Sequence, residues 1–146
     1  MVDAFDADAL IYAAQPGHPL GEKVAALFPP GPVTTPIEKA GVGSALLVPE
    51  VLGKPLKDGD ADAVRKLSEM LVRLDLRPVD GATAARAAVL GAKYNLHAPD
   101  AIHLATAIGM GAQRFITNNK RDFGESIKEI DITYPADLPP RLSPGI

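Results

Sequence analysis

The segment Val2-Asp3-Ala4-Phe5-Asp6-Ala7-Asp8-Ala9-Leu10-Ile11-Tyr12 decides the fold class of this chain. Its first part, residues 2–5, is short and mostly apolar and predicts a strand, while residues 9–14 predict a helix that ends before Gln15-Pro16-Gly17. Asp6 then follows the strand directly, at its carboxyl end, and Asp8 is placed to cap the helix. Strands that lead straight into helices are the units from which parallel sheets are built.

The same alternation continues along the chain. Helices are predicted at residues 20–28, 60–74 and 83–94 and from Pro99 onward, and further strands at residues 76–79, 114–117 and 130–134. Ser44 is expected to cap a short helix that carries Glu50, although Pro49 should kink or break that helix. The intervening residues 33–43 have no clear pattern.

Short apolar strands that alternate with helices of ten or more residues indicate an α/β fold. We predict a three-layer α/β/α sandwich with a central, mostly parallel sheet of four to five strands. The length of 146 residues suits a single hydrophobic core. We therefore expect one domain over residues 1–134 and an extended, Pro-rich C-terminal tail over residues 135–146.

Four acidic residues lie inside apolar stretches or directly after them: Asp6, Glu50, Asp100 and Asp122. Drawing an unpaired carboxylate toward the interior is costly, and a hard divalent cation offsets that cost for several carboxylates at once. Such a site predicts Mg²⁺ or Mn²⁺. Because ligands of parallel α/β folds bind beyond the carboxyl ends of the strands, the four acids can converge there. His103 shares a helix face with Asp100, but we expect it to pack or to form hydrogen bonds, since hard cations prefer oxygen.

Composition excludes several classes of protein. The chain has no run of about 18 apolar residues and no basic and apolar N-terminal segment, so we expect neither a membrane span nor a secretory signal. The absence of cysteine excludes disulfides, thiolate metal sites and thiol catalysis. We therefore expect a soluble, cytoplasmic protein.

The net charge of −3 argues against a broad basic surface that binds nucleic acid non-specifically. Once the four acids are set aside as metal ligands, however, the rest of the chain carries a charge of +1. A local basic rim near the last acidic segment is therefore possible, formed by Arg114, Lys120, Arg121 and Lys128.

Taken in order, the four acidic segments resemble those of the PIN-domain ribonucleases, and the length is similar to that of the stand-alone VapC-like toxins of toxin–antitoxin pairs. Phe5-Asp6 followed by Leu10-Ile11-Tyr12 is similar to the opening of such domains, and Glu50-Val51-Leu52 to their second motif. The most specific match is Ala98-Pro99-Asp100-Ala101-Ile102-His103-Leu104-Ala105-Thr106-Ala107. The resemblance extends over nearly the whole chain, from Asp6 to Phe123.

This resemblance implies an endoribonuclease that hydrolyses RNA phosphodiester bonds with water activated by Mg²⁺ or Mn²⁺. Asp6, Glu50 and Asp100 would hold the metal. It further implies a cognate antitoxin protein, part of which docks into a groove near the acidic site, and a homodimer. Unpaired RNA is the expected substrate, because its bases can be splayed and read.

The fourth acidic position departs from the family pattern. Many members carry an Asp two residues after Thr117, where this chain has Asn119. Either Asp122 supplies the fourth carboxylate, or the site works with three carboxylates and an amide, which leaves the number of metal ions open. Thr117, Asn118 and Asn119 would orient water or phosphate.

Two alternatives stay open. Asp6-Ala7-Asp8 after one strand and Thr117 after another also resemble two motifs of haloacid-dehalogenase-type phosphatases, in which Asp6 would be the nucleophile. That family places a further acidic motif well downstream of the Thr, and only 29 residues remain here. The second alternative, favoured by Asn119, is a non-catalytic module that binds RNA or a protein through the same pocket.

Overall fold

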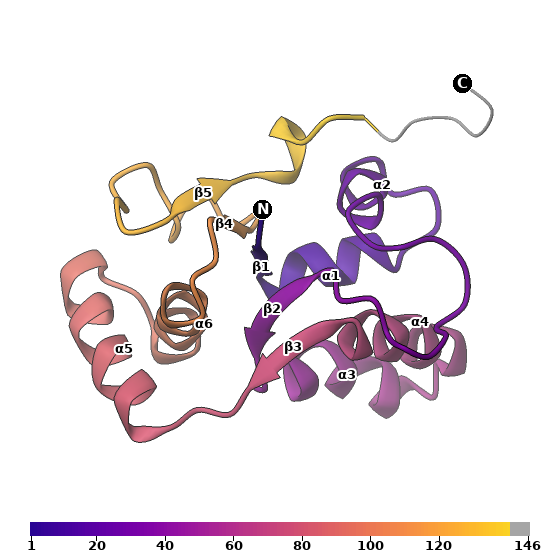
Figure 1. The fold of residues 1–146 in the computed structure, drawn as a ribbon, viewed down its shortest axis with the longest axis horizontal. Coiled ribbons are helices and arrows are strands. Elements are labelled where there is room, and N and C mark those ends of the chain that lie inside the picture. Colours follow the sequence, from indigo (N-terminus) through magenta and orange to yellow (C-terminus); the bar gives the residue numbers. More distant parts are fainter. Residues whose placement is uncertain (141–146) are drawn as a thin grey trace.

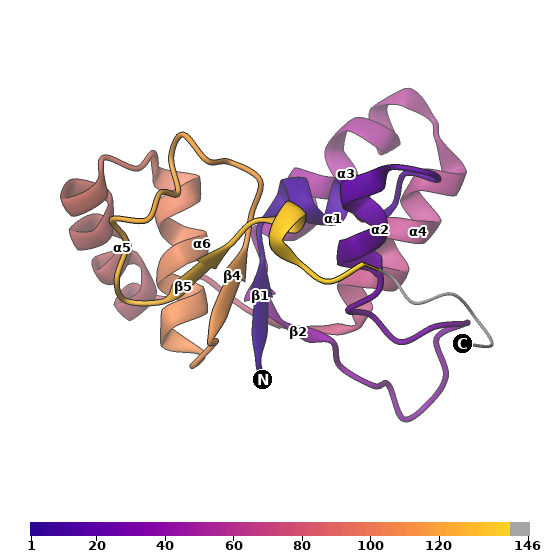
Figure 2. The same cartoon turned by 90° about the horizontal axis from the view of Figure 1, so that it is seen from above.

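A five-stranded parallel sheet lies between two layers of helices in the computed structural model, which describes residues 1–140 (Figure 1, Figure 2). The strand order is β3-β2-β1-β4-β5, and every pair is parallel. The strands are β1 (Asp3–Phe5), β2 (Gly41–Ser44), β3 (Leu74–Arg77), β4 (Arg114–Ile116) and β5 (Asp131–Thr133). The predicted α/β/α sandwich is confirmed.

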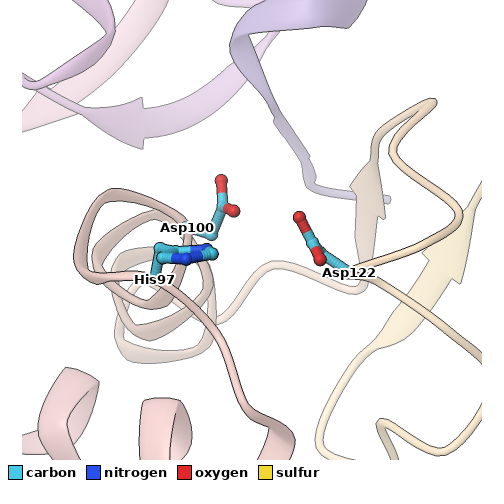
Figure 3. A group of neighbouring side chains, drawn as sticks. All are labelled: His97, Asp100 and Asp122. Atoms are coloured by element: carbon cyan, nitrogen blue, oxygen red, sulfur yellow. The ribbon is translucent and has the colours of Figure 1, made fainter.

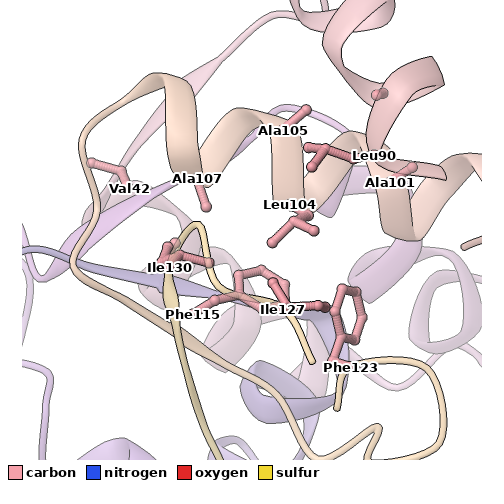
Figure 4. Packing of buried hydrophobic residues seen from close by; sticks show 12 residues of the cluster. Val42, Leu90, Ala101, Leu104, Ala105, Ala107, Phe115, Phe123, Ile127 and Ile130 are labelled. Atoms are coloured by element: carbon pink, nitrogen blue, oxygen red, sulfur yellow. The ribbon is translucent and has the colours of Figure 1, made fainter. Parts of the chain in front are cut away.

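Helices cover both faces of the sheet, and each face has its own apolar cluster (Figure 2). One face carries α1 (Ala7–Ala13), α2 (Pro19–Ala25), α3 (Leu47–Asp58) and α4 (Ala61–Val72), and the other carries α5 (Gly81–Tyr94) and α6 (Ala98–Gly109). Phe5, Leu10 and Val24 are buried on the first side, and Leu104 and Phe115 on the second, which Figure 4 shows.

Local capping explains the best-predicted helices. The side chain of Asp60 accepts a hydrogen bond from the Ala63 N–H (3.1 Å), and Asp80 accepts one from the Thr83 N–H (2.8 Å). Each satisfies a backbone donor that the first turn would leave unpaired. Asn95 ends α5 in the left-handed conformation, at φ 55°, as an Asn in that position predicts.

The structure corrects the prediction of a helix that begins at Ser44. Ser44 is the last residue of β2, and α3 begins at Leu47 with Pro49 in its first turn, where the missing N–H removes no helical hydrogen bond. The glycine-rich sequence of β2 does not predict a strand. Gly41 is nevertheless required there, because a Cβ atom would lie 2.3 Å from the Asp3 carbonyl oxygen on the adjacent β1.

The C-terminal segment departs from the predicted extended tail. Pro135–Asp137 forms a short 3₁₀ helix, η1, and Leu138 is buried in the cluster on the α1–α4 side. Lys23 of α2 also donates to the Ala136 carbonyl at 2.9 Å. Extended chain is therefore the wrong prediction for residues 135–137, and the rest of the predicted tail, residues 141–146, lies outside the described residues. Within residues 1–140, no helix combines the length and apolar character needed to cross a membrane.

Candidate metal centre

Three adjacent strands, β2, β1 and β4, run in the same direction, so their carboxyl ends meet at one edge of the sheet. Asp6 follows β1, Glu50 lies in the first turn of α3 after β2, and Asp122 lies in the loop after β4. Asp100 lies in the first turn of α6. Burial raises the pKa of Asp100, and the nearby charges of Asp6, Asp122 and Glu50 raise it further. The structure therefore brings the four acids predicted from the sequence together.

Asp6 is buried, with 6% of its surface exposed, and each carboxylate oxygen accepts a hydrogen bond. The Ala7 N–H donates to Oδ1 (2.9 Å), and the Thr117 hydroxyl donates to Oδ2 (2.7 Å). Asp6 is thus the N-cap of α1, which corrects the prediction that Asp8 caps this helix. Burial raises the pKa of Asp6, and the Thr117 hydrogen bond opposes this only in part.

A hydrogen bond joins Glu50 Oε1 to His103 Nε2 at 2.9 Å. The His103 side chain is 1% exposed, whereas that of Glu50 is 31% exposed. The carboxylate therefore lies at the surface of the site and is held from beneath. This agrees with the hydrogen-bonding role predicted for His103.

His97, Asp100 and Asp122 form the tightest group of ligand atoms found within residues 1–140 (Figure 3). Each offers one ligand atom, and these atoms lie within 4.8 Å of one another. The Asn119 amide donates to Asp122 Oδ2 (3.0 Å), and its Oδ1 accepts from the Asp122 N–H (3.2 Å). Of the two candidates for the fourth position, Asp122 therefore reaches Asp100, whereas Asn119 holds Asp122.

Sequence reasoning missed His97. The signal that could have found it is its place immediately before Ala98-Pro99, the start of α6, three residues ahead of Asp100. A residue there shares a helix face with Asp100.

Asp8 is a further acid of the site that the sequence does not single out. Its Oδ2 accepts a hydrogen bond from the Asn118 N–H (3.1 Å), whereas its Oδ1 is buried and has no hydrogen-bond partner in the described part of the chain. Burial first, and then the charges of Asp6 and Asp100, raise the pKa of Asp8 to about 7.

The predicted basic rim is only partly present. Arg114 is the first residue of β4 and binds both carboxylate oxygens of Asp3, the first residue of β1, at 2.8 and 2.9 Å. This pair lies at the amino end of the strands, opposite the acids, so Arg114 is not part of the rim. Arg121 lies 3.5 Å from Asp122, and Lys120 lies over the Tyr134 ring at 5.2 Å.

The model of the PIN domain family matches residues 4–126. The chain belongs to the PIN domain family. Members of this family are generally metal-dependent nucleases. The match confirms the resemblance read from the sequence, and the comparisons give no support to the phosphatase or to the non-catalytic module.

Two solved structures share the fold of this PIN domain. A toxin–antitoxin complex from Klebsiella pneumoniae is 24% identical, with a TM-score of 0.70 over 92% of this chain and 98% of that chain. VapBC2 from Rickettsia felis, bound to a DNA fragment from its promoter, is 15% identical, with a TM-score of 0.64 and the same coverage. The comparison with curated proteins found no match.

The donor set of this PIN domain fits a divalent cation. Its ligand atoms are mainly carboxylate oxygens, which suit Mg²⁺ and Mn²⁺, and their mutual repulsion raises the pKa values of Asp8 and Asp100. A cation would relieve that repulsion and would attract the unpartnered Oδ1 of Asp8. The residues that could hold it are Asp6, Glu50, Asp100 and Asp122.

Proposed function

We propose that this PIN domain is the toxin of a toxin–antitoxin pair and hydrolyses RNA phosphodiester bonds with Mg²⁺ or Mn²⁺. The observation that carries the proposal is the convergence of Asp6, Glu50, Asp100 and Asp122 from four separate segments at one edge of the sheet. The toxin assignment is supported by the two structures of similar fold, which are named as VapBC2 and a toxin–antitoxin complex.

When bound, the cation would lower the pKa of a coordinated water and stabilise charge on the phosphate oxygens. Neighbouring side chains hold the carboxylates in place for it: Thr117 donates to Asp6, and Asn119 donates to Asp122. The Thr117 hydroxyl is buried and also accepts from the Asn119 N–H at 3.1 Å, so Thr117 acts on Asp6 rather than directly on substrate. Asn118, whose side chain is half-buried, remains the proposed contact for water or phosphate.

Lys120 and Arg121 are the cations proposed to meet the RNA backbone. Both are exposed and lie in the loop that carries Asp122. Cations beside the acids would attract a phosphate that the carboxylates alone repel.

A groove of about 250 Å³ between α1, α3 and α4 ends at Glu50 and is the proposed antitoxin site. Ile11, Val51 and Leu67 give it an apolar floor, and Asp58 and Asp60 add negative charge. It fits an antitoxin segment with apolar side chains and a Lys or Arg directed at Glu50. The protein is also proposed to form a homodimer, but not through Val24 of α2, which is buried in the core.

Cleavage of RNA by the purified protein tests the proposed reaction. We expect cleavage with Mg²⁺ or Mn²⁺, none with EDTA, and at least a hundredfold loss of rate in Asp6→Asn, Glu50→Gln and Asp100→Asn, on the order expected when a metal ligand is removed. The matched control is Asp62→Asn, because Asp62 is 84% exposed and lies on α4. Activity that survives excess EDTA would refute the mechanism, and release of phosphate from phosphomonoesters would favour the phosphatase.

Binding to the product of a small neighbouring gene tests the antitoxin. Ala63→Arg in the groove should weaken this binding at least tenfold by steric clash and by neutralising nearby acids, on the order of about 1.4 kcal/mol. Val89→Arg is the control, since Val89 is 67% exposed and lies on α5, on the other face of the sheet. Light scattering reports the oligomeric state, and a monomer would exclude the homodimer.

A further inference from the structure

His97 stands at the N-cap position of α6 and is exposed, and its side chain makes no capping hydrogen bond. We propose that His97 is a direct ligand of the metal, together with Asp100 and Asp122. The centre is then a mixed nitrogen and oxygen site that favours transition-metal ions such as Mn²⁺ over Mg²⁺. This inference rests on the proposed function, because it takes the metal of that site as given.

The geometry of the three side chains suits one ion. Their ligand atoms lie within 4.8 Å of one another, and Figure 3 shows them converging from the start of α6 and from the loop after β4. An ion about 2.1 Å from each ligand atom separates neighbouring octahedral ligands by about 3 Å and opposite ones by about 4.2 Å. A small rotation of the exposed His97 side chain therefore brings the set to bonding distances, while Asn119 already fixes Asp122.

The other two histidines are committed elsewhere, out of three in the sequence. His18 stacks on the Tyr12 ring at 4.4 Å and accepts a hydrogen bond from the Gly21 N–H at 3.1 Å. His103 is buried with its Nε2 bonded to Glu50. Only His97 presents an imidazole to the group that contains Asp100 and Asp122.

The chemistry of the nitrogen donor sets the metal preference. Mg²⁺ demands oxygen ligands in near-ideal octahedral geometry, whereas imidazole binds transition-metal ions well. Adding one imidazole to a set of carboxylates thus raises affinity for Mn²⁺ more than affinity for Mg²⁺. His97 is in this sense a residue that determines metal specificity.

Pulsed EPR of the Mn²⁺-loaded protein tests the inference without any activity assay. We expect a ¹⁴N coupling from a bound imidazole in the wild type, its loss in His97→Ala, and its retention in His103→Gln. Calorimetric titration should show the Mn²⁺ Kd of His97→Ala raised about tenfold or more and the Mg²⁺ Kd raised less than about threefold. Because His97 is exposed and makes no capping bond, His97→Ala should keep the helix content of the wild type.

Each outcome separates this inference from the proposed function. If Mn²⁺ binds but the wild type shows no ¹⁴N coupling, or the coupling persists in His97→Ala, the His97 ligand is refuted and the carboxylate site stands. Equal losses of Mn²⁺ and Mg²⁺ affinity would refute the metal preference. If the wild type binds no metal, both the inference and the proposed metal-dependent function fail.

Discussion

Ionisation of Asp8 should make the metal-free protein less stable as the pH rises. Burial and the charges of Asp6 and Asp100 raise its pKa from 3.8 to about 7 in the folded state. The unfolded chain therefore releases this proton first, so the stability that the protonated carboxyl contributes is complete below pH 3.8 and is lost as the pH rises through about 7. Above that value the loss is constant.

The size of the effect follows from the shift. A difference of about 3 pKa units corresponds to roughly 4 kcal/mol, and because the side chain is only partly buried, solvent screening reduces this to about 2 kcal/mol. Asp8→Asn cannot ionise, yet it keeps an oxygen that can accept the hydrogen bond from the Asn118 N–H. We expect the variant to exceed the wild type in free energy of unfolding by about 2 kcal/mol at pH 8 and by less than about 1 kcal/mol at pH 5.

Urea denaturation followed by circular dichroism, with EDTA present and at both pH values, measures these free energies. Asp62→Asn is the matched control, since Asp62 is 84% exposed, and its effect should not change between pH 5 and pH 8. A gap between Asp8→Asn and the wild type that is equal at the two pH values would refute the reasoning. So would a variant that is less stable than the wild type at pH 8.

Three further changes test the site and the packing beneath it. Asp6→Asn can keep its contacts with Ala7 and Thr117, so in EDTA its melting temperature should equal or exceed that of the wild type, while its rise on adding Mn²⁺ should fall by at least about half; equal rises would show that Asp6 is not a ligand. Thr117→Val removes the hydroxyl from a buried carboxylate and should cost about 1–3 kcal/mol of stability in urea denaturation, whereas Thr117→Ser should restore most of it. Gly21→Ala places a Cβ atom 1.9 Å from the Tyr12 carbonyl oxygen and should cost more than about 2 kcal/mol, whereas Gly53→Ala, in open space on α3, should stabilise by about 0.5–1 kcal/mol; similar effects from the two would contradict the close contact of α1 and α2.

The sequence by itself determined the elements whose signals lie within a few residues of one another. Asp80 and Asn95 bound α5 because an N-cap acceptor and a left-handed C-cap are properties of the adjacent backbone. Asp6 and Asp100 were found in the same way, since a carboxylate at a strand end or after a helix-starting Pro is visible locally. The convergence of these acids could also be predicted, because parallel strands place their carboxyl ends at one edge.

Only the tertiary structure decided which distant residues meet. Strand β2 escapes the sequence because its glycines are selected by contact with the β1 backbone, as the Gly41 approach to Asp3 shows. Arg114 reads as part of a basic rim until the register of β1 with β4 places it beside Asp3, 111 residues away. The hydroxyl of Thr117 reads as a contact for substrate until the same pairing turns it toward Asp6. Likewise, the unpartnered oxygen of Asp8 and the approach of His97 to Asp122 depend on how the loop after β4 folds back over α1 and α6, and no local pattern encodes that arrangement.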